Sequence, residues 1–395
     1  MTVAATRRHV HPFPARMAPD IALEKITDLK PTRATVLDPM CGSGTVVRLA
    51  SEAGHTAIGT DLDPMAVMLT RTASIKAWST GLAERAAELV EEARALAPGA
   101  PEWFAGDADT VQFVNYWFDD TQADDLSRLA RALVHRPRSD DPLRVALSRL
   151  IVTKDAGASL ARDTSHSRPH KTRDTNDFDV MPRFVHAASK IATIVEAGGA
   201  TTVRPSVRRV DARSLGFVKS QSIDLVVTSP PYLNAIDYLR GHRMSLVWLG
   251  WTTTALRSLR GSTIGAERGL NEPSGVVRTI SDTRGDLSKP LSDRHQKMVF
   301  RFARDAHDFC RALARVVKPN GTVVFVVADS QLKGVPISNS NICAAAARYH
   351  GLKLVKTETR EIPARHRYLP PPEGETSSLA SRMKQEVIFT FRRAA

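Results

Sequence analysis

Residues 34–45 read ATVLDPMCGSGT and give the clearest indication of the fold. An apolar run predicts a strand that ends at Asp38, and the following loop opens a helix at Thr45. Gly42 and Gly44 permit unusual dihedrals and a close approach of the backbone to a ligand. The loop lacks the Lys-Ser/Thr ending of a nucleoside triphosphate P-loop, and its spacing is not the GxGxxG dinucleotide fingerprint. The stretch therefore predicts an α/β sheet with a ligand loop of another kind.

Acidic residues follow the predicted strands. Asp38 ends the first strand, where its carboxylate can pair with a cationic amino group. A second strand at residues 56–60 leads into Asp61, and an acid in this place commonly binds ribose hydroxyls. Asp211 lies in a loop before a later strand. Each acid alone fits a helix cap or a surface charge better than a ligand contact, but their order along the chain predicts one site.

A Pro-Pro turn follows a later apolar run, where residues 228–238 read TSPPYLNAIDY. Pro230 and Pro231 have no N–H, so neighbouring carbonyls remain available as acceptors. Ser229 adds a hydroxyl acceptor and Tyr232 a flat face for stacking. These groups suit a planar exocyclic amine, which has two N–H groups to donate. A turn that merely ends a strand is the better interpretation of the motif taken alone.

Together these motifs resemble those of the S-adenosylmethionine-dependent amino-methyltransferases of DNA. In that family DPMCGSGT corresponds to the cofactor loop, TSPPY to the catalytic tetrad, Asp61 to the ribose acid and Asp211 to the adenine-side acid. Residues 11–16, HPFPAR, are similar to the family's N-terminal cofactor motif. The family often has phenylalanine in its loop where this chain has Asp38-Pro39, a variant that keeps the acid.

The resemblance implies S-adenosylmethionine as the cofactor and a Rossmann-like class I methyltransferase fold. It implies cofactor binding by His11, Phe13, Asp38, Pro39, Cys41, Gly42, Gly44, Thr45, Asp61 and Asp211. It implies catalytic roles for Ser229, Pro230, Pro231 and Tyr232. The resemblance extends to residues 365–372 and to a closing strand at 386–391, whereas the middle of the chain matches no named pattern.

Alternating strand and helix patterns at both ends of the chain predict a seven-stranded, mostly parallel sheet. Strands are expected at 34–39, 56–61, 201–207, 222–228, 321–328, 352–360 and 386–392. Helices are expected after Gly44, Pro64 and Tyr232 and over 295–317. Helical patterns at 82–96, 126–134 and 142–152 predict a mostly helical insert at 78–199. The catalytic domain is then expected to comprise 1–77 and 200–395.

The insert separates Asp61 from Asp211 and is expected beside the active-site face, where the alpha-type arrangement of the family has its target-recognition domain. Residues 161–174 mix basic and hydroxyl side chains without apolar periodicity. They predict phosphate contacts from Arg162, Arg168, Lys171 and Arg173. A solvated loop explains this composition equally well. A second irregular stretch, 261–293, is too long for a simple connector and is expected to close over DNA or cofactor.

Charge and cysteine content narrow the class of protein. The 395 residues carry 55 Lys and Arg against 42 Asp and Glu, a net charge of +13, which suits DNA or RNA as a partner. With no apolar run of 18 residues and no apolar h-region at the N-terminus, we expect a cytoplasmic protein without a membrane partner. Cys41, Cys310 and Cys343 lack metal-ligand spacing, so neither a metal site nor a disulfide scaffold is expected. None stands in the Pro-Cys setting that methylation of cytosine carbon 5 requires.

The resemblance implies an enzyme that methylates double-stranded DNA, and the motif order, cofactor loop before insert before TSPPY, fits the alpha-type arrangement. The target base must leave the stack to present its amine, with Tyr232 replacing the lost stacking. Ser229 and the Pro230 carbonyl are expected to accept the amine hydrogens. His242 and Arg243 are expected to seat the following helix rather than to contact substrate.

In the family, serine before Pro-Pro accompanies cytosine N4 methylation more often than adenine N6 methylation, where aspartate is commoner. We therefore expect cytosine N4 as the acceptor, with adenine N6 as the alternative. Ser229 and the basic insert disfavour an RNA or protein-glutamine amino-methyltransferase. The intact motifs disfavour a non-catalytic DNA-binding relative. A cognate restriction endonuclease would fit such an enzyme as a partner. Neither the recognition sequence nor the oligomeric state follows from the motifs.

Overall fold

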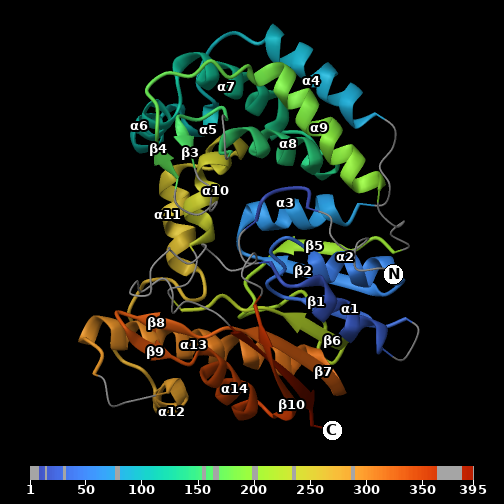
Figure 1. The fold of residues 1–395 in the computed structure, drawn as a ribbon, viewed down its shortest axis with the longest axis vertical. Coiled ribbons are helices and arrows are strands. Elements are labelled where there is room, and N and C mark those ends of the chain that lie inside the picture. The colour runs from blue at the N-terminus through green and yellow to red at the C-terminus, as the bar shows by residue number, and fades with distance from the viewer. Residues whose placement is uncertain are drawn as a thin grey trace.

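A seven-stranded sheet organises the chain. The computed structural model describes residues 9–13, 16–29, 33–75, 81–153, 157–162, 169–197, 203–233, 237–285, 290–362 and 385–394. The strand order in the sheet is β10-β11-β7-β6-β1-β2-β5 (Figure 1). The strands are β1 Thr35–Asp38, β2 Thr56–Asp61, β5 Ser206–Arg209, β6 Ile223–Thr228, β7 Val317–Val327, β10 Leu352–Glu361 and β11 Gln385–Arg393.

Strand direction identifies the fold. The pairs β1–β2, β1–β6, β2–β5 and β6–β7 are parallel. The last strand, β11, runs antiparallel to both of its neighbours, β7 and β10. Counted along the chain, β11 is the seventh strand of the sheet, and it lies reversed between the fifth strand, β7, and the sixth, β10. This order is that of the class I methyltransferase fold. The predicted α/β fold class is confirmed.

Strand positions agree with the sequence pattern, with two differences. Residues 201–202 of the strand expected at 201–207 lie outside the described residues. Over 203–207 the strand begins at Ser206, directly after Pro205, which has no N–H to donate to a ladder. The strand expected at 321–328 begins earlier, at Val317. The central strands β1, β6 and β7 are buried on both faces, as parallel strands covered by helices are.

Helices cover both faces of the sheet. One face packs against α1 Pro19–Thr27 and α2 Thr45–Glu52. The other packs against α12 Gly275–Ser281, α13 Asp293–Val316 and α14 Asn339–Tyr349. The stretch expected to be irregular, 261–293, thus contains α12, whose first turn is capped by the Ser274 hydroxyl, and the short η4 Asp282–Arg284. A small hairpin, β8 Ser330–Leu332 and β9 Val335–Ile337, follows β7.

A second layer, of helices, lies beyond the β5 edge of the sheet and over α3 Pro64–Ala73 (Figure 1). Its first members are α4 Leu82–Ala95, α5 Glu102–Ala105, α6 Ala108–Trp117, α7 Asp120–Val134, η2 Arg138–Asp140, α8 Asp141–Ile151 and α9 Val180–Glu196. A short hairpin, β3 Ala161–Arg162 and β4 His170–Lys171, joins them. The helix expected at 126–134 begins six residues earlier because the Asp119 carboxylate caps its N-terminus.

The helical layer also includes a segment from the catalytic half of the chain. After the Pro-Pro turn come α10 Tyr238–Leu246, η3 Val247–Leu249 and α11 Thr253–Ser262, which share one apolar core with the insert. Trp248 is fully buried in that core, edge-on to Phe104 and Phe118. The turn therefore connects the sheet directly to the helical layer.

Among the described residues, no helix is long and apolar enough to cross a membrane. Within the same residues, no group of three or more His, Cys, Asp or Glu side chains is arranged to hold a metal ion. Cys41, Cys310 and Cys343 are buried free thiols, the last two on α13 and α14.

Candidate active site

One pocket lies at the carboxyl ends of β1, β2 and β6, where open parallel sheets bind ligands. It brings together ten of the residues predicted from the sequence: Phe13, Asp38, Pro39, Cys41, Gly42, Thr45, Asp61, Asp211, Ser229 and Pro231. Among the predicted cofactor-binding and catalytic residues, four do not line it: His11, Gly44, Pro230 and Tyr232. The glycine loop and the Pro-Pro turn, far apart in sequence, therefore face one space.

The glycine loop is held by its own backbone and by α3. Gly42 has a positive φ of 49° and its N–H donates to Asp61 Oδ2 at 3.0 Å. The Thr70 hydroxyl, on α3, donates to the Gly42 carbonyl at 3.1 Å. Cys41 is buried beneath the loop, and burial raises the pKa of its thiol well above the ordinary value. The loop forms a wall of the pocket, and its buried, protonated thiol is a poor nucleophile.

Gly44 shapes the loop without lining the pocket. It caps α2 with a left-handed backbone, φ 82°, and a Cβ there would lie 2.8 Å from the Thr70 Cα. We expect Gly44→Ala to lower the free energy of unfolding by about 1–3 kcal/mol through backbone strain and this clash. Thermal and urea unfolding measure the change. Gly216→Ala is the matched control, because no atom lies within 4 Å of its added Cβ. Equal stability of the two variants would contradict the assigned role.

Asp61 links the loop to the next helix. Its Oδ1 accepts from the backbone N–H of Asp63 at 2.9 Å, while its Oδ2 accepts from Gly42. Burial, with the nearby charge of Asp63, raises the pKa of Asp61 to about 6. A carboxylate held in this way favours a ligand that donates hydrogen bonds or carries positive charge.

Asp38 is the most deeply buried acid of the pocket. Its Oδ1 accepts from the Thr228 hydroxyl at 2.9 Å and from the Met40 N–H at 3.2 Å. Burial raises the pKa of Asp38 to about 7, with a further contribution from the charge of Asp61. The pocket thus holds two carboxylates whose ionisation a bound cation would favour.

Asp211 lines the pocket but already has a cationic partner. Its two carboxylate oxygens pair with the Arg213 guanidinium at 2.6–3.1 Å. Arg213 also reaches the buried Asp305 on α13 at 2.7 Å. This ion pair fixes the Asp211 carboxylate at the pocket wall, so only its remaining lone pairs can accept from a ligand.

The Pro-Pro turn presents Ser229 to the pocket. The Ser229 Oγ and the Tyr232 hydroxyl lie 3.1 Å apart, within hydrogen-bond distance. The Tyr232 ring packs against the core on the α13 side of the sheet, and burial raises its pKa to about 12. The neutral phenol therefore orients the serine hydroxyl. The stacking role expected of Tyr232 stays a prediction.

An aromatic pair closes the other side of the pocket. The Phe13 ring stacks on Tyr238 with centroids 5.3 Å apart and lies 5.4 Å from the His242 ring. His11 turns away from the pocket: its Nε2 lies 2.9 Å from Ser148 Oγ on α8. The N-terminal motif thus contributes Phe13 to the pocket and uses His11 to hold the helical layer.

Several pocket residues were not selected from the sequence. They come from the N-terminal segment, the glycine loop and α2, the start of α3, the loop after β5, the start of α10 and the segment after α11: Arg16, Met17, Met40, Ser43, Val46, Leu62, Asp63, Ala66, Ala212, Asp237, Tyr238, Leu239, Thr263 and Ile264. Asp63 caps α3 and its Oδ2 lies 2.5 Å from the Nδ1 of His242, which seats α10 as expected. The Asp63-Pro64 helix start was visible in the sequence, but this partner 179 residues away was not.

The predicted phosphate-binding residues have mixed environments. Arg162 is exposed on β3, and the Lys171 Nζ lies 5.3 Å above the Tyr116 ring. Arg173 donates to the carbonyls of Gly157 and Ser159 at 3.4 and 3.3 Å, so its guanidinium holds its own loop. Arg168 and the 365–372 segment lie outside the described residues.

Comparison with known proteins gives two methyltransferase relatives. No protein-family model matches the chain. It is 21% identical to the type II methyltransferase M.MvaI of Kocuria varians, over 99% of this chain and 92% of that protein. It is 24% identical to the type II methyltransferase M.BsoBI of Geobacillus stearothermophilus, over 57% of this chain and 49% of that one.

Solved structures add little. The match to a TehB-like S-adenosylmethionine-dependent methyltransferase of Corynebacterium glutamicum covers 94% of this chain and 87% of that protein, at 9% identity and a TM-score of 0.30. The match to the rRNA methyltransferase AviRa of Streptomyces viridochromogenes covers 99% of this chain and 93% of that protein, at 11% identity and a TM-score of 0.32. The fold assignment rests on the strand order of the sheet. The chain has the class I methyltransferase fold and is similar to type II methyltransferases.

Proposed function

We propose that the protein transfers a methyl group from S-adenosylmethionine to the exocyclic amine of a base extruded from double-stranded DNA, with cytosine N4 as the acceptor. The observation that carries the proposal is the single pocket shared by the glycine loop, the carboxylates Asp38 and Asp61, and the hydroxyl of Ser229. The similarity to two type II methyltransferases supports DNA as the substrate. Residues 78–199 are the target-recognition region in this proposal.

The pocket residues fit the cofactor. S-adenosylmethionine supplies a methyl group on a positively charged sulfonium. Asp61 binds the ribose hydroxyls, and the buried Asp38 favours the positive charge of the ligand. The Nη1 of Arg16 is buried and has no hydrogen-bond partner among the described residues. Because Arg16 lines the same pocket, it complements the carboxylate of the cofactor.

The Pro-Pro turn handles the base. An aromatic amine is a poor nucleophile because its lone pair is delocalised into the ring. Ser229 Oγ and the Pro230 carbonyl accept the two amine hydrogens and draw the nitrogen towards a tetrahedral geometry. Tyr232 holds the serine hydroxyl in place. Transfer is a direct displacement helped by positioning, and the excess proton leaves to solvent.

The pH dependence of cofactor binding tests the two acids. A bound cation favours ionised Asp38 and Asp61, whose pKa values lie near 7 and 6. The dissociation constant for S-adenosylmethionine should therefore fall as pH rises from about 5.5 to about 8, by up to about tenfold per pH unit for each acid. The stability of the ligand-free protein depends on pH in the opposite direction. The folded chain binds these two protons more tightly than the unfolded chain, because both pKa values are raised. The contribution of both groups to the free energy of unfolding therefore declines from about pH 4 to about pH 7.

Calorimetry at several pH values measures this dependence. Asp38→Asn is the informative variant, because it removes the group with the higher pKa and should flatten the upper part of the profile. A dissociation constant that does not change between about pH 5.5 and 8 would contradict the assigned role of the acids.

The proposed reaction is tested on DNA from cells that express the protein. The DNA is digested and its nucleosides are analysed by mass spectrometry, with cells expressing the Ser229→Ala variant as the control. We expect N4-methylcytosine. N6-methyladenine alone would replace cytosine by adenine as the acceptor, and failure of the purified protein to bind S-adenosylmethionine would favour a non-catalytic DNA-binding role.

A further inference from the structure

A second groove opens next to the active-site pocket. It lies in the helical layer between α6 on one side and α10 and α11 on the other. Leu239, at the start of α10, lines both this groove and the pocket. A ligand in the pocket and a polymer in the groove would therefore be neighbours.

The groove is strongly basic. Four arginines line it against a single aspartate, Asp109: Arg240, Arg243, Arg257 and Arg260. The Asp109 carboxylate pairs with Arg257 at 3.3 Å, but both side chains are more than half exposed, so the pair is weak. Arg260 pairs with Asp237 at 2.5 Å. The remaining positive charge is not matched by acids in the groove wall.

Arg243 shows that the positive charge is crowded. Its guanidinium lies 4.9 Å from the Phe113 ring centroid, and its Nε is buried without a hydrogen-bond partner among the described residues. Burial lowers its pKa, and the charges of Arg240, Arg260 and Arg257 lower it further. A bound anion would relieve both the unmet donor and the repulsion between the arginines.

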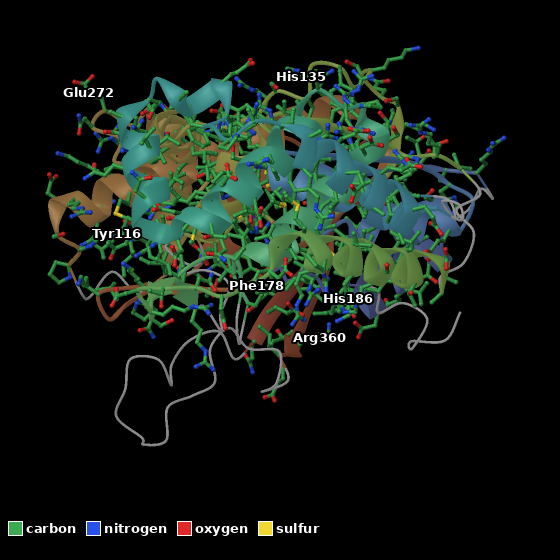
Figure 2. All side chains as sticks on the ribbon, turned by 90° about the horizontal axis from the view of Figure 1, so that it is seen from above. Tyr116, His135, Phe178, His186, Glu272 and Arg360 are labelled. Atoms are coloured by element: carbon green, nitrogen blue, oxygen red, sulfur yellow. The ribbon has the colours of Figure 1, made fainter. Side chains whose placement is uncertain are left out.

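Aromatic side chains accompany the arginines. Phe113, Tyr116 and Trp117 of α6 line the same groove. Tyr116 is 53% exposed and lies at the periphery of the molecule (Figure 2). The Lys171 Nζ of β4 lies 5.3 Å from the centroid of its ring, which places a further basic side chain beside the groove. Arginines with exposed aromatic faces suit a nucleic acid strand, whose phosphates bind guanidinium groups and whose bases stack.

We propose that this groove binds the sugar-phosphate backbone of the DNA strand that carries the target base. The inference rests on the proposed function and assigns it an interaction surface. Arg240, Arg243 and Arg257 contact the phosphates that flank the extruded nucleotide, and Tyr116 supports the strand. For Arg243 this role replaces the helix-seating role expected from the sequence. Arg173 of the basic loop is occupied by its own backbone contacts, so the groove, more than that loop, positions the strand.

The salt dependence of DNA binding tests the proposal. The exposed Arg240 and Arg257 are changed together, Arg240→Gln/Arg257→Gln, which leaves the buried core intact. Anisotropy of a labelled mixed-sequence duplex of about 30 base pairs is measured between about 50 and 200 mM salt. Each lost phosphate contact reduces the slope of log affinity against log salt by about 0.9, so a reduction of about 2 and an affinity loss of about tenfold or more are expected.

Arg94→Gln/Arg311→Gln is the matched control. It removes the same charge from two exposed, ion-paired arginines that do not line the groove. The groove variant and this control could bind the duplex with equal affinity and salt slope. If the unmodified protein then binds both duplex and S-adenosylmethionine, the groove assignment alone is wrong. If the unmodified protein binds neither, the proposed function itself fails.

Discussion

Asp61→Ala is expected to weaken binding of S-adenosylmethionine by about a hundredfold, the loss of roughly 2.7 kcal/mol. The variant loses a charged acceptor for the ribose hydroxyls, and hydrogen bonds to charged groups contribute about 1.5–3 kcal/mol. It also leaves the Gly42 N–H without its acceptor at 3.0 Å, so the loop loses its link to β2. Calorimetric titration of the purified variant measures the effect.

Two comparisons make this result specific. Asp61→Asn keeps the size of the side chain and one carbonyl acceptor, so it should bind the cofactor more weakly than the unmodified protein but better than the alanine variant. Asp308→Ala removes an acid that pairs with Arg311 on α13 and does not line the pocket, and it should leave binding unchanged. An Asp61→Ala variant that folds and binds with the original affinity would show that another group holds the ribose.

The strands and their acids were predictable because each carries a local signal. The alternation of strand and helix patterns, the glycine loop and the Pro-Pro turn are all written in short stretches of sequence. Asp38, Asp61 and Ser229 each stand at a strand end, and the parallel order of the sheet brings those ends to one edge. Local pattern and topology together placed ten predicted residues in one pocket.

The remaining contacts depend on long-range packing that no local pattern reports. The stacking of Phe13 on Tyr238 joins segments 225 residues apart, and the pairing of Asp63 with His242 joins α3 to α10. The basic groove is similar: Phe113 and Arg243 meet only because α10 and α11 fold onto the insert. The sequence favoured the 161–174 segment because its basic residues fall within one short stretch, whereas those of the groove are spread over two helices.

Ser229→Ala should reduce the rate of methyl transfer by about 10²–10³-fold, the usual effect of removing one preorganised hydrogen-bonding group from a reacting centre. Affinity for S-adenosylmethionine should stay within about threefold, a difference below 1 kcal/mol, because Ser229 acts on the base. Single-turnover transfer of labelled methyl groups to unmethylated genomic DNA measures the rate.

Tyr232→Phe removes only the hydroxyl 3.1 Å from Ser229 Oγ and should have a smaller effect. Ser222→Ala, just before the start of the same strand, is the control. If Ser229→Ala transfers methyl groups as fast as that control, the serine ends a strand and has no part in the chemistry.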